Sequence, residues 1–131
     1  MVTAFYASLL TLWFVFLSMR VIALRGNPMF AFLILGASPD DMLERAVRAH
    51  GNLAEYTPIM LILLYLLETL PAASVTQTTL HMLAGSFLLG RLMHGLCFGF
   101  MTSSMPLRIG GTALTLLPLI GVALILLTSV V

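Results

Sequence analysis

Charge is scarce in this sequence, and lysine is absent from it altogether. Charged residues make up 8% of the 131 positions and hydrophobic residues 60%, and all six basic residues are arginine. A soluble domain of this size carries about 25% charged residues. The chain therefore lacks the polar groups needed to cover itself in water, and the composition predicts an integral membrane protein. The formal net charge of +1 gives no indication of a nucleic-acid partner.

Cysteine is nearly absent as well. Cys97 is the only one, so no disulfide can form within the chain. It lies in an apolar run with no second thiol at metal-ligand spacing, so we interpret it as a small core residue and expect no metal site. The N-terminus lacks the basic segment and cleavage site of a signal peptide, so the uncharged stretch from Val2 to Met19 predicts a transmembrane helix.

Four long apolar segments predict an all-α, four-helix membrane bundle that forms one domain over residues 1–131. About 20 apolar residues are enough to cross a bilayer. Gly26, Asn27 and Pro28 interrupt the first segment. Ser38 and Pro39 are typical of the start of the second, as N-cap and first-turn residue. The predicted helices cover about residues 2–24, 39–70, 75–100 and 106–131.

The connections between these helices indicate the orientation of the chain. All six arginines fall toward the first and third connections, whereas the second connection and both termini contain none. The positive-inside rule therefore predicts that the first and third connections lie in the cytoplasm and both termini outside. The first connection is also apolar from Met29 to Leu35, so we expect it to lie against the bilayer or a neighbouring subunit.

The predicted second helix carries a polar stripe in its N-terminal half. At about 100° per residue, its members fall within roughly 80° of one another and extend some 15 Å along the helix axis. They are Arg45, Arg48, Asn52 and Glu55. A charged group inside a membrane is costly and by default marks a functional site with a partner, so we expect an arginine counter-ion for Glu55, the deepest of them. The alternatives are a salt-bridge network that only locks the bundle and, for Arg45, a solvated surface position.

The third and fourth helices supply further polar groups. Arg91, His94 and Phe98 lie at positions i, i+3 and i+7, which form one stripe near the cytoplasmic end. Arg108 opens the fourth helix, either as a site residue or as a snorkelling anchor at the interface. The packed core of one four-helix chain has no room for so many charged groups. The polar faces therefore predict a cavity or a second subunit, and we expect a homo-oligomer.

Three motifs resemble those of the MAPEG family (membrane-associated proteins in eicosanoid and glutathione metabolism) and occur in the same order. The second-helix signature is the most specific: Glu44-Arg45-x-x-Arg48-Ala-His50-x-Asn52-x-x-Glu55-Tyr56-x-Pro58. The third-helix and fourth-helix motifs are shorter: Gly90-Arg91-Leu92-x-His94 and Pro106-Leu107-Arg108. The short length and the start of the fourth helix are most similar to the small bacterial members, which implies the bacterial inner membrane.

The resemblance implies a homotrimer that binds glutathione as co-substrate at subunit interfaces near the cytoplasmic side. Family members include microsomal glutathione transferases, leukotriene and prostaglandin synthases, and a non-enzymatic lipid-binding protein. It therefore implies a transferase or peroxidase that acts on lipophilic electrophiles arriving through membrane lipid. By position, Arg108 would be the catalytic residue that activates the thiol. The implied glutathione-binding residues are Arg25, Arg48, Asn52, Glu55, Tyr56, Arg91 and His94.

The sequence also departs from the family pattern at three positions. Phe98 stands where several members carry a tyrosine, Gly51 replaces an arginine of some members, and Ile109 replaces a serine. Thiol activation would then depend on Arg108 alone. Two hypotheses follow: a glutathione-dependent enzyme, favoured by Arg108, and a non-enzymatic lipid- or glutathione-binding scaffold of the same fold, favoured by Phe98. A small transporter is a weaker third, because the sequence shows no pair of broken mid-membrane helices.

Overall fold

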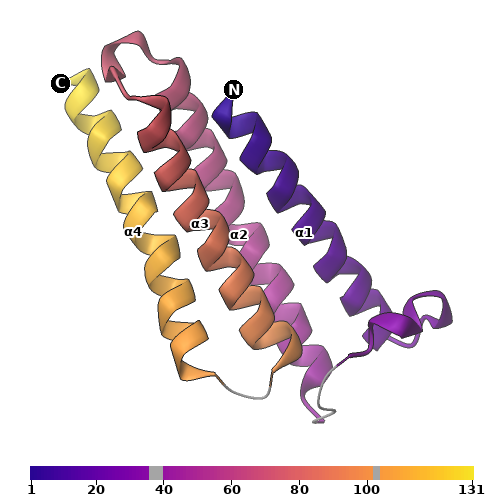
Figure 1. Cartoon of the computed structure of the whole chain (residues 1–131). Helices are drawn as coiled ribbons and strands as arrows, with labels where there is room; N and C mark the ends of the chain where they lie inside the picture. The colour runs from indigo at the N-terminus through magenta and orange to yellow at the C-terminus, as the bar shows by residue number, and fades with distance from the viewer. Residues whose placement is uncertain (36–39, 102–103) are drawn as a thin grey trace.

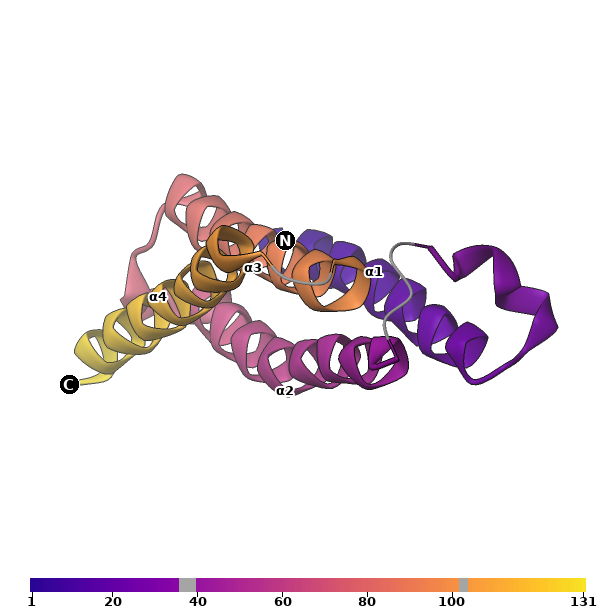
Figure 2. The same ribbon diagram turned by 90° about the horizontal axis from the view of Figure 1, so that it is seen from below.

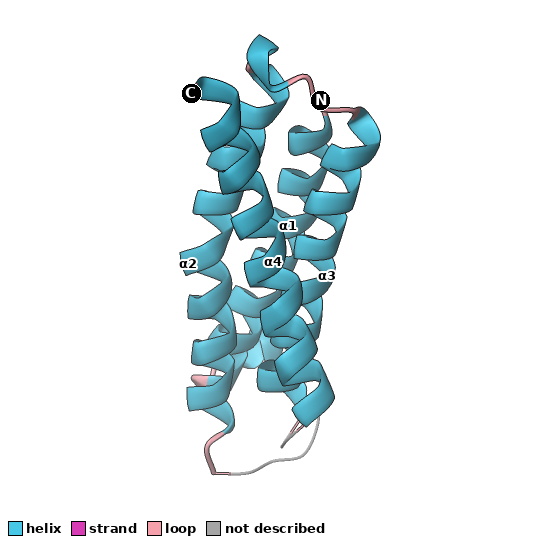
Figure 3. Cartoon of the chain, turned by 90° about the vertical axis from the view of Figure 1, so that its left-hand side faces the viewer, coloured by secondary structure: helices cyan, strands magenta, loops and turns pink. Residues whose placement is uncertain are grey.

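The structure, a computed structural model, describes residues 1–35, 40–101 and 104–131. Within these ranges the chain is helical and contains no strand (Figure 3). The four long helices are α1 (Val2–Leu24), α2 (Met42–Thr69), α3 (Gln77–Phe100) and α4 (Met105–Val130). Two short 3-10 helices lie between them, η1 (Pro28–Leu33) and η2 (Pro71–Ala73).

The long helices form an up-and-down bundle (Figure 1). Both termini lie at one end, together with η2, while η1 and the first residues of α2 and α4 lie at the other. Contacts are most extensive between α3 and α4, followed by those of α2 with α1 and α3. This arrangement brings the helix ends that flank the first and third connections to a single end of the molecule, which is compatible with the predicted orientation.

The predicted helix boundaries agree with the structure to within a few residues. The first helix has the predicted bounds, and α4 is shifted by one residue at each end. Helix α3 begins at Gln77 instead of 75, because the Thr76 side chain accepts a hydrogen bond from the Thr79 amide at 3.2 Å and so caps the helix. The predicted cap Ser38 and first-turn residue Pro39 of the second helix lie outside the described residues.

Three of the four helices are long and apolar enough to cross a membrane, namely α1, α3 and α4. Helix α2 has 28 residues, but its N-terminal half carries the polar stripe and its composition does not meet the same requirement. It nevertheless runs antiparallel beside α1 and α3 for most of their length (Figure 1). The fourth membrane span therefore remains a prediction.

Large apolar side chains fill the centre of the bundle and small residues let the helices approach one another. The buried core includes Leu17, Met60 and Phe87, each at most 1% exposed. Helices α3 and α4 meet through two glycines. A Cβ atom on Gly90 would lie 2.8 Å from the carbonyl carbon of Leu114, and one on Gly111 would lie 3.0 Å from the backbone nitrogen of His94. This contact holds the two helices in register close to the polar residues.

The two ends of α1 are fixed by charged side chains. At its start, the Glu68 carboxylate on α2 accepts hydrogen bonds from the backbone amides of Val2 at 2.5 Å and Thr3 at 2.9 Å. A carboxylate at this position satisfies amides that lack a partner in the helix and complements the positive end of the helix dipole. Near the other end, Arg20 is completely buried. Charged groups thus mark the two ends of an otherwise apolar helix.

Candidate functional site

An open groove of about 470 Å³ lies between α2 and α3 at the arginine-rich end. Its lining combines basic, acidic, amide and aromatic side chains: Val47, Arg48, Gly51, Asn52, Glu55, His94 and Phe98. Four of the residues expected to bind glutathione are in this set, so the structure brings together Arg48, Asn52, Glu55 and His94.

The two charged residues of the groove do not pair with each other. Arg48 donates to Glu44 at 2.5 Å, one turn back on α2, and both side chains are about two-thirds exposed, at 66% and 64%. Glu55 is exposed, and no hydrogen bond or ion pair reaches it from the described residues of this chain. The expectation of an arginine counter-ion for Glu55 is therefore wrong within a single chain. Its carboxylate faces outward, where a ligand or a second subunit can reach it.

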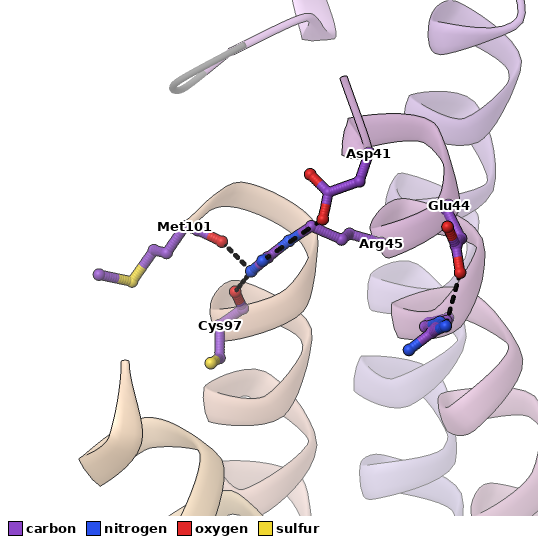
Figure 4. Close-up of polar contacts among 6 residues, drawn as sticks. Asp41, Glu44, Arg45, Cys97 and Met101 are labelled. Atoms are coloured by element: carbon purple, nitrogen blue, oxygen red, sulfur yellow. Dashed lines mark hydrogen bonds and ion pairs between the residues drawn. The ribbon is translucent and has the colours of Figure 1, made fainter. Parts of the chain in front are cut away.

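Arg45 leaves the polar stripe and turns toward the end of α3 (Figure 4). Its guanidinium donates to the backbone carbonyl of Cys97 at 3.2 Å and to that of Met101, and lies 3.9 Å from the Asp41 carboxylate. These contacts tie the start of α2 to the end of α3. Arg45 is therefore neither a groove residue nor a freely solvated one, and the predicted stripe divides into two parts.

Arg91 lies inside the chain, next to the groove but not in its lining. It is 3% exposed, and its Nε donates to the Thr115 hydroxyl of α4 at 2.9 Å while Nη2 donates to the same oxygen. Its Nη1 donates to the side-chain oxygen of Asn52 on α2. The guanidinium carbon lies 5.2 Å from the centre of the Tyr56 ring. Arg91 thus joins α2, α3 and α4 and holds two of the predicted site residues.

The bond from Arg91 determines how Asn52 is presented. A guanidinium can only donate hydrogen bonds, so the oxygen of the Asn52 amide must face Arg91. The amide nitrogen is then left to donate in another direction. Beside this contact lies a small polar cavity of about 30 Å³, lined by Asn52, Tyr56, Arg91, His94, Thr112, Thr115 and Leu116. It is large enough for one water molecule.

Arg108 and two rings form the other side of the site. The rings of His94 and Phe98 stack with centroids 4.6 Å apart and an interplanar angle of 26°. The guanidinium carbon of Arg108 lies 5.9 Å from the centre of the Phe98 ring, and the side chain is exposed. The structure therefore places Arg108 at the edge of the groove. Arg25 directly follows α1 as its C-cap residue, is exposed and does not line this groove.

Two findings correct the sequence-based picture. One chain does accommodate charged groups in its packed interior, because Arg20 and Arg91 are both buried there. The sequence reasoning also missed Thr115, which is 1% exposed and bonds Arg91. Its position seven residues after Arg108, on the same face of α4, was the available signal.

The groove can bind a small molecule that carries both signs of charge. Arg48 and Arg108 offer donors to carboxylates, Glu55 offers an acceptor to an amine, and Asn52 offers an amide donor. Among the described residues, no group of three or more histidine, cysteine, aspartate or glutamate side chains is placed to hold a metal ion.

Comparison with known proteins agrees with this description. The sequence model of the MAPEG family matches residues 3–128. The chain is also 37% identical over 95 residues to the inner membrane protein YecN of Escherichia coli strain K12, an alignment that covers 72% of this chain and 67% of YecN. The figures for YecN of Escherichia coli O6:H1 are the same. No solved structure matches the chain.

The chain therefore belongs to the MAPEG family and is an integral membrane protein. The family resemblance of the three sequence motifs is confirmed over nearly the whole length of the chain.

Proposed function

We propose that this protein is a glutathione-dependent transferase or peroxidase that acts on lipophilic electrophiles within the membrane. The observation that carries the proposal is the groove itself. In a chain of the MAPEG family, Arg48 and Glu55 lie exposed in one groove with Asn52, and Arg108 lies at its edge. Glutathione has two carboxylates, one amine and one thiol, which are the groups that such a set of side chains complements.

In the proposed complex, arginine forks bind the carboxylates and Glu55 binds the amine. Paired N–H donors of a guanidinium match the two oxygens of a carboxylate. The free amide nitrogen of Asn52 donates to a backbone carbonyl of the tripeptide, and Tyr56 and His94 pack beside it. Arg108 lies next to the sulfur. A nearby cation lowers a thiol pKa from its usual value of about 8.5, and each unit corresponds to about 1.4 kcal/mol. The thiolate then bonds to the electrophilic atom of a substrate that arrives through the lipid and displaces its leaving group. In the peroxidase reaction it attacks an oxygen of a hydroperoxide and releases the alcohol, and a second glutathione converts the resulting sulfenate into the disulfide and water.

The proposed assembly is a homotrimer with the groove closed by a neighbouring subunit. Arg25, Arg48, Glu55 and Arg108 are all exposed in one chain. Exposed charges near the membrane interior need partners that water does not supply there. A neighbouring subunit covers the open side of the groove and allows Arg25, which does not reach the groove of its own chain, to contact glutathione bound to the next one. We place this site toward the cytoplasm, where the arginine-rich end is expected.

A second candidate function is a scaffold of the same fold that binds glutathione or a lipid without chemistry. The observation that favours it is Phe98, which occupies the position between His94 and Arg108 with a ring that has no hydroxyl. Phe98 therefore offers no hydrogen bond to the sulfur. In this case the arginine at the edge of the groove serves only to bind a carboxylate.

Calorimetry with the purified protein tests the proposal. Native mass spectrometry in detergent first establishes whether the sample is a trimer. Glutathione is then titrated into the trimer, with S-methylglutathione as a matched ligand that keeps both carboxylates and the amine but has no free thiol. Saturable binding, followed by conjugation to an apolar electrophile, is the expected result. Binding without conjugation or peroxide reduction favours the scaffold, and a trimer without binding contradicts both.

A further inference from the structure

The segment η1 and the two residues that follow it present apolar side chains away from the bundle. Leu33 is 5% exposed and points inward, whereas Met29 is 73% exposed, Phe32 69% and Leu35 53%. Figures 1 and 2 both show η1 beside the end of α1, on the side away from α4. No other part of the described chain covers these side chains. The described part of the chain therefore leaves these side chains open to their surroundings.

The position of η1 along α1 indicates its depth. Glu68 marks the start of α1 with a charged group, and Val2 to Leu24 extends about 33 Å at about 1.5 Å per residue. The hydrocarbon core of a bilayer is about 30 Å thick. With the start of α1 at one interface, its end lies at the other, and η1 follows within a few residues. The segment is thus at the level where lipid headgroups meet acyl chains.

Polar side chains of the protein form hydrogen bonds with the backbone of η1 and of the residues just after it. The buried guanidinium of Arg20 donates to the carbonyls of Leu33 and, at 2.8 Å, Leu35, while its Nε donates to the carbonyl of Gly99 at 2.7 Å. The side-chain oxygen of Asn27 accepts from the Met29 amide at 3.0 Å. Irregular backbone is tolerated at membrane depth where protein groups satisfy it, because no water is available there. A segment in open water does not need a buried arginine for its carbonyls.

From these observations we infer that η1 is an interfacial membrane element. It lies in the boundary between headgroups and acyl chains of the leaflet at the arginine-rich end, with Met29, Phe32 and, just after η1, Leu35 inserted among the lipids. Arg20 anchors η1, since its hydrogen bonds fix the segment to the ends of α1 and α3. An arginine-rich end also suits the phosphate groups of that leaflet. This inference does not depend on glutathione binding.

Spin labelling of the full chain in liposomes tests the inference. Cys97 is replaced by alanine, and single cysteines are introduced by Phe32→Cys and, as an aqueous control, by the exposed Asp40→Cys. The liposomes contain phosphatidylethanolamine and phosphatidylglycerol, and lipids with nitroxides at known acyl carbons provide the depth scale. We expect the label at position 32 to meet oxygen more often than a water-soluble nickel chelate, as a lipid label near the headgroup does.

Two results would overturn the inference. A label at position 32 with the same accessibility as the label at position 40 would place η1 in water. A label that neither oxygen nor nickel chelate reaches would show that protein covers the segment, as in contact with a second copy.

The anchoring role of Arg20 is tested by adding Arg20→Lys to the Phe32→Cys chain. Lysine keeps the charge but cannot bond the three carbonyls in the same geometry, so the spectrum should show a more mobile label. An unchanged spectrum would contradict the role of Arg20.

Discussion

The Nε of Arg91 on α3 donates to the hydroxyl of Thr115 on α4 at 2.9 Å, in the interior of the bundle. The same guanidinium donates to the Asn52 side chain on α2. The Thr115 hydroxyl donates its own hydrogen bond to the carbonyl of Gly111 at 2.7 Å, so its oxygen lone pairs can accept from Arg91. One buried cation therefore determines both the spacing of three helices and the orientation of an amide in the groove.

Replacing Thr115 by valine should destabilise the protein and weaken glutathione binding. Valine has nearly the same shape but leaves two guanidinium donors without their acceptor, a loss of about 1–3 kcal/mol for a buried polar group. Thr115→Ser keeps the hydroxyl and serves as the control. Thermal unfolding in detergent and calorimetry should both separate the two variants. If valine and serine behave alike, Thr115 is only a packing residue.

Gly90→Ala should disrupt the contact of α3 and α4. The new Cβ would stand 2.8 Å from backbone of α4, and overpacking of this kind costs about 1–3 kcal/mol. Gly99→Ala on the same helix is the matched control, because its Cβ meets the nearest side chain at 3.7 Å, an ordinary contact. We expect a lower melting temperature for Gly90→Ala alone. Equal melting temperatures for the two variants would show that α3 and α4 can move apart to fit the methyl group without loss of stability.

Both chain termini should lie outside the cytoplasm. The six arginines surround the first and third connections, and the structure brings both termini to the opposite end (Figure 1). Two fusions to the C-terminus measure the location of that end. Alkaline phosphatase is active only outside the cytoplasm, whereas a green fluorescent protein is fluorescent in the cytoplasm. A fluorescent fusion with inactive phosphatase would place the groove on the side away from cytosolic glutathione.

Arg108 and Glu55 should affect different steps of the proposed reaction. Arg108→Ala is expected to lower turnover at saturating glutathione much more than it lowers glutathione affinity, because the thiol pKa returns toward its solution value. The fraction of thiolate at neutral pH falls about tenfold for each pKa unit that is lost. Glu55→Gln keeps the shape but removes the charge for the glutathione amine, so affinity should fall first. We compare the two variants as trimers in the same detergent, by calorimetry for glutathione affinity and by the rate of conjugation for turnover. Equal losses of affinity, with turnover of Arg108→Ala intact, would make Arg108 a carboxylate ligand.

The sequence predicts the helices well, because apolar segments of bilayer length leave few other folds for the chain. Helical periodicity also places Arg48, Asn52 and Glu55 on a common face, whereas the family resemblance alone implies that His94 belongs to the same site. The same periodicity does not say which partner a side chain meets. Arg91 turns inward because Thr115, which is 24 residues away, supplies an acceptor.

The role of Arg20 was even less accessible to sequence reasoning. Its acceptors are the backbone carbonyls of Leu33, Leu35 and Gly99, and a carbonyl is present at every position whatever the residue. The apolar character of η1 was visible, whereas its 3-10 helix and its attachment to α3 depend on a contact between segments far apart in the chain.

The most direct test of the central proposal is the ultraviolet difference absorbance of thiolate when glutathione is added to the trimer at neutral pH. For the unmodified protein we expect a saturable increase, which S-methylglutathione abolishes by competition and does not itself produce. We expect Arg108→Ala to lose most of this signal while it still binds glutathione. Bound glutathione with no more thiolate than the free tripeptide, or a full signal in Arg108→Ala, would contradict it.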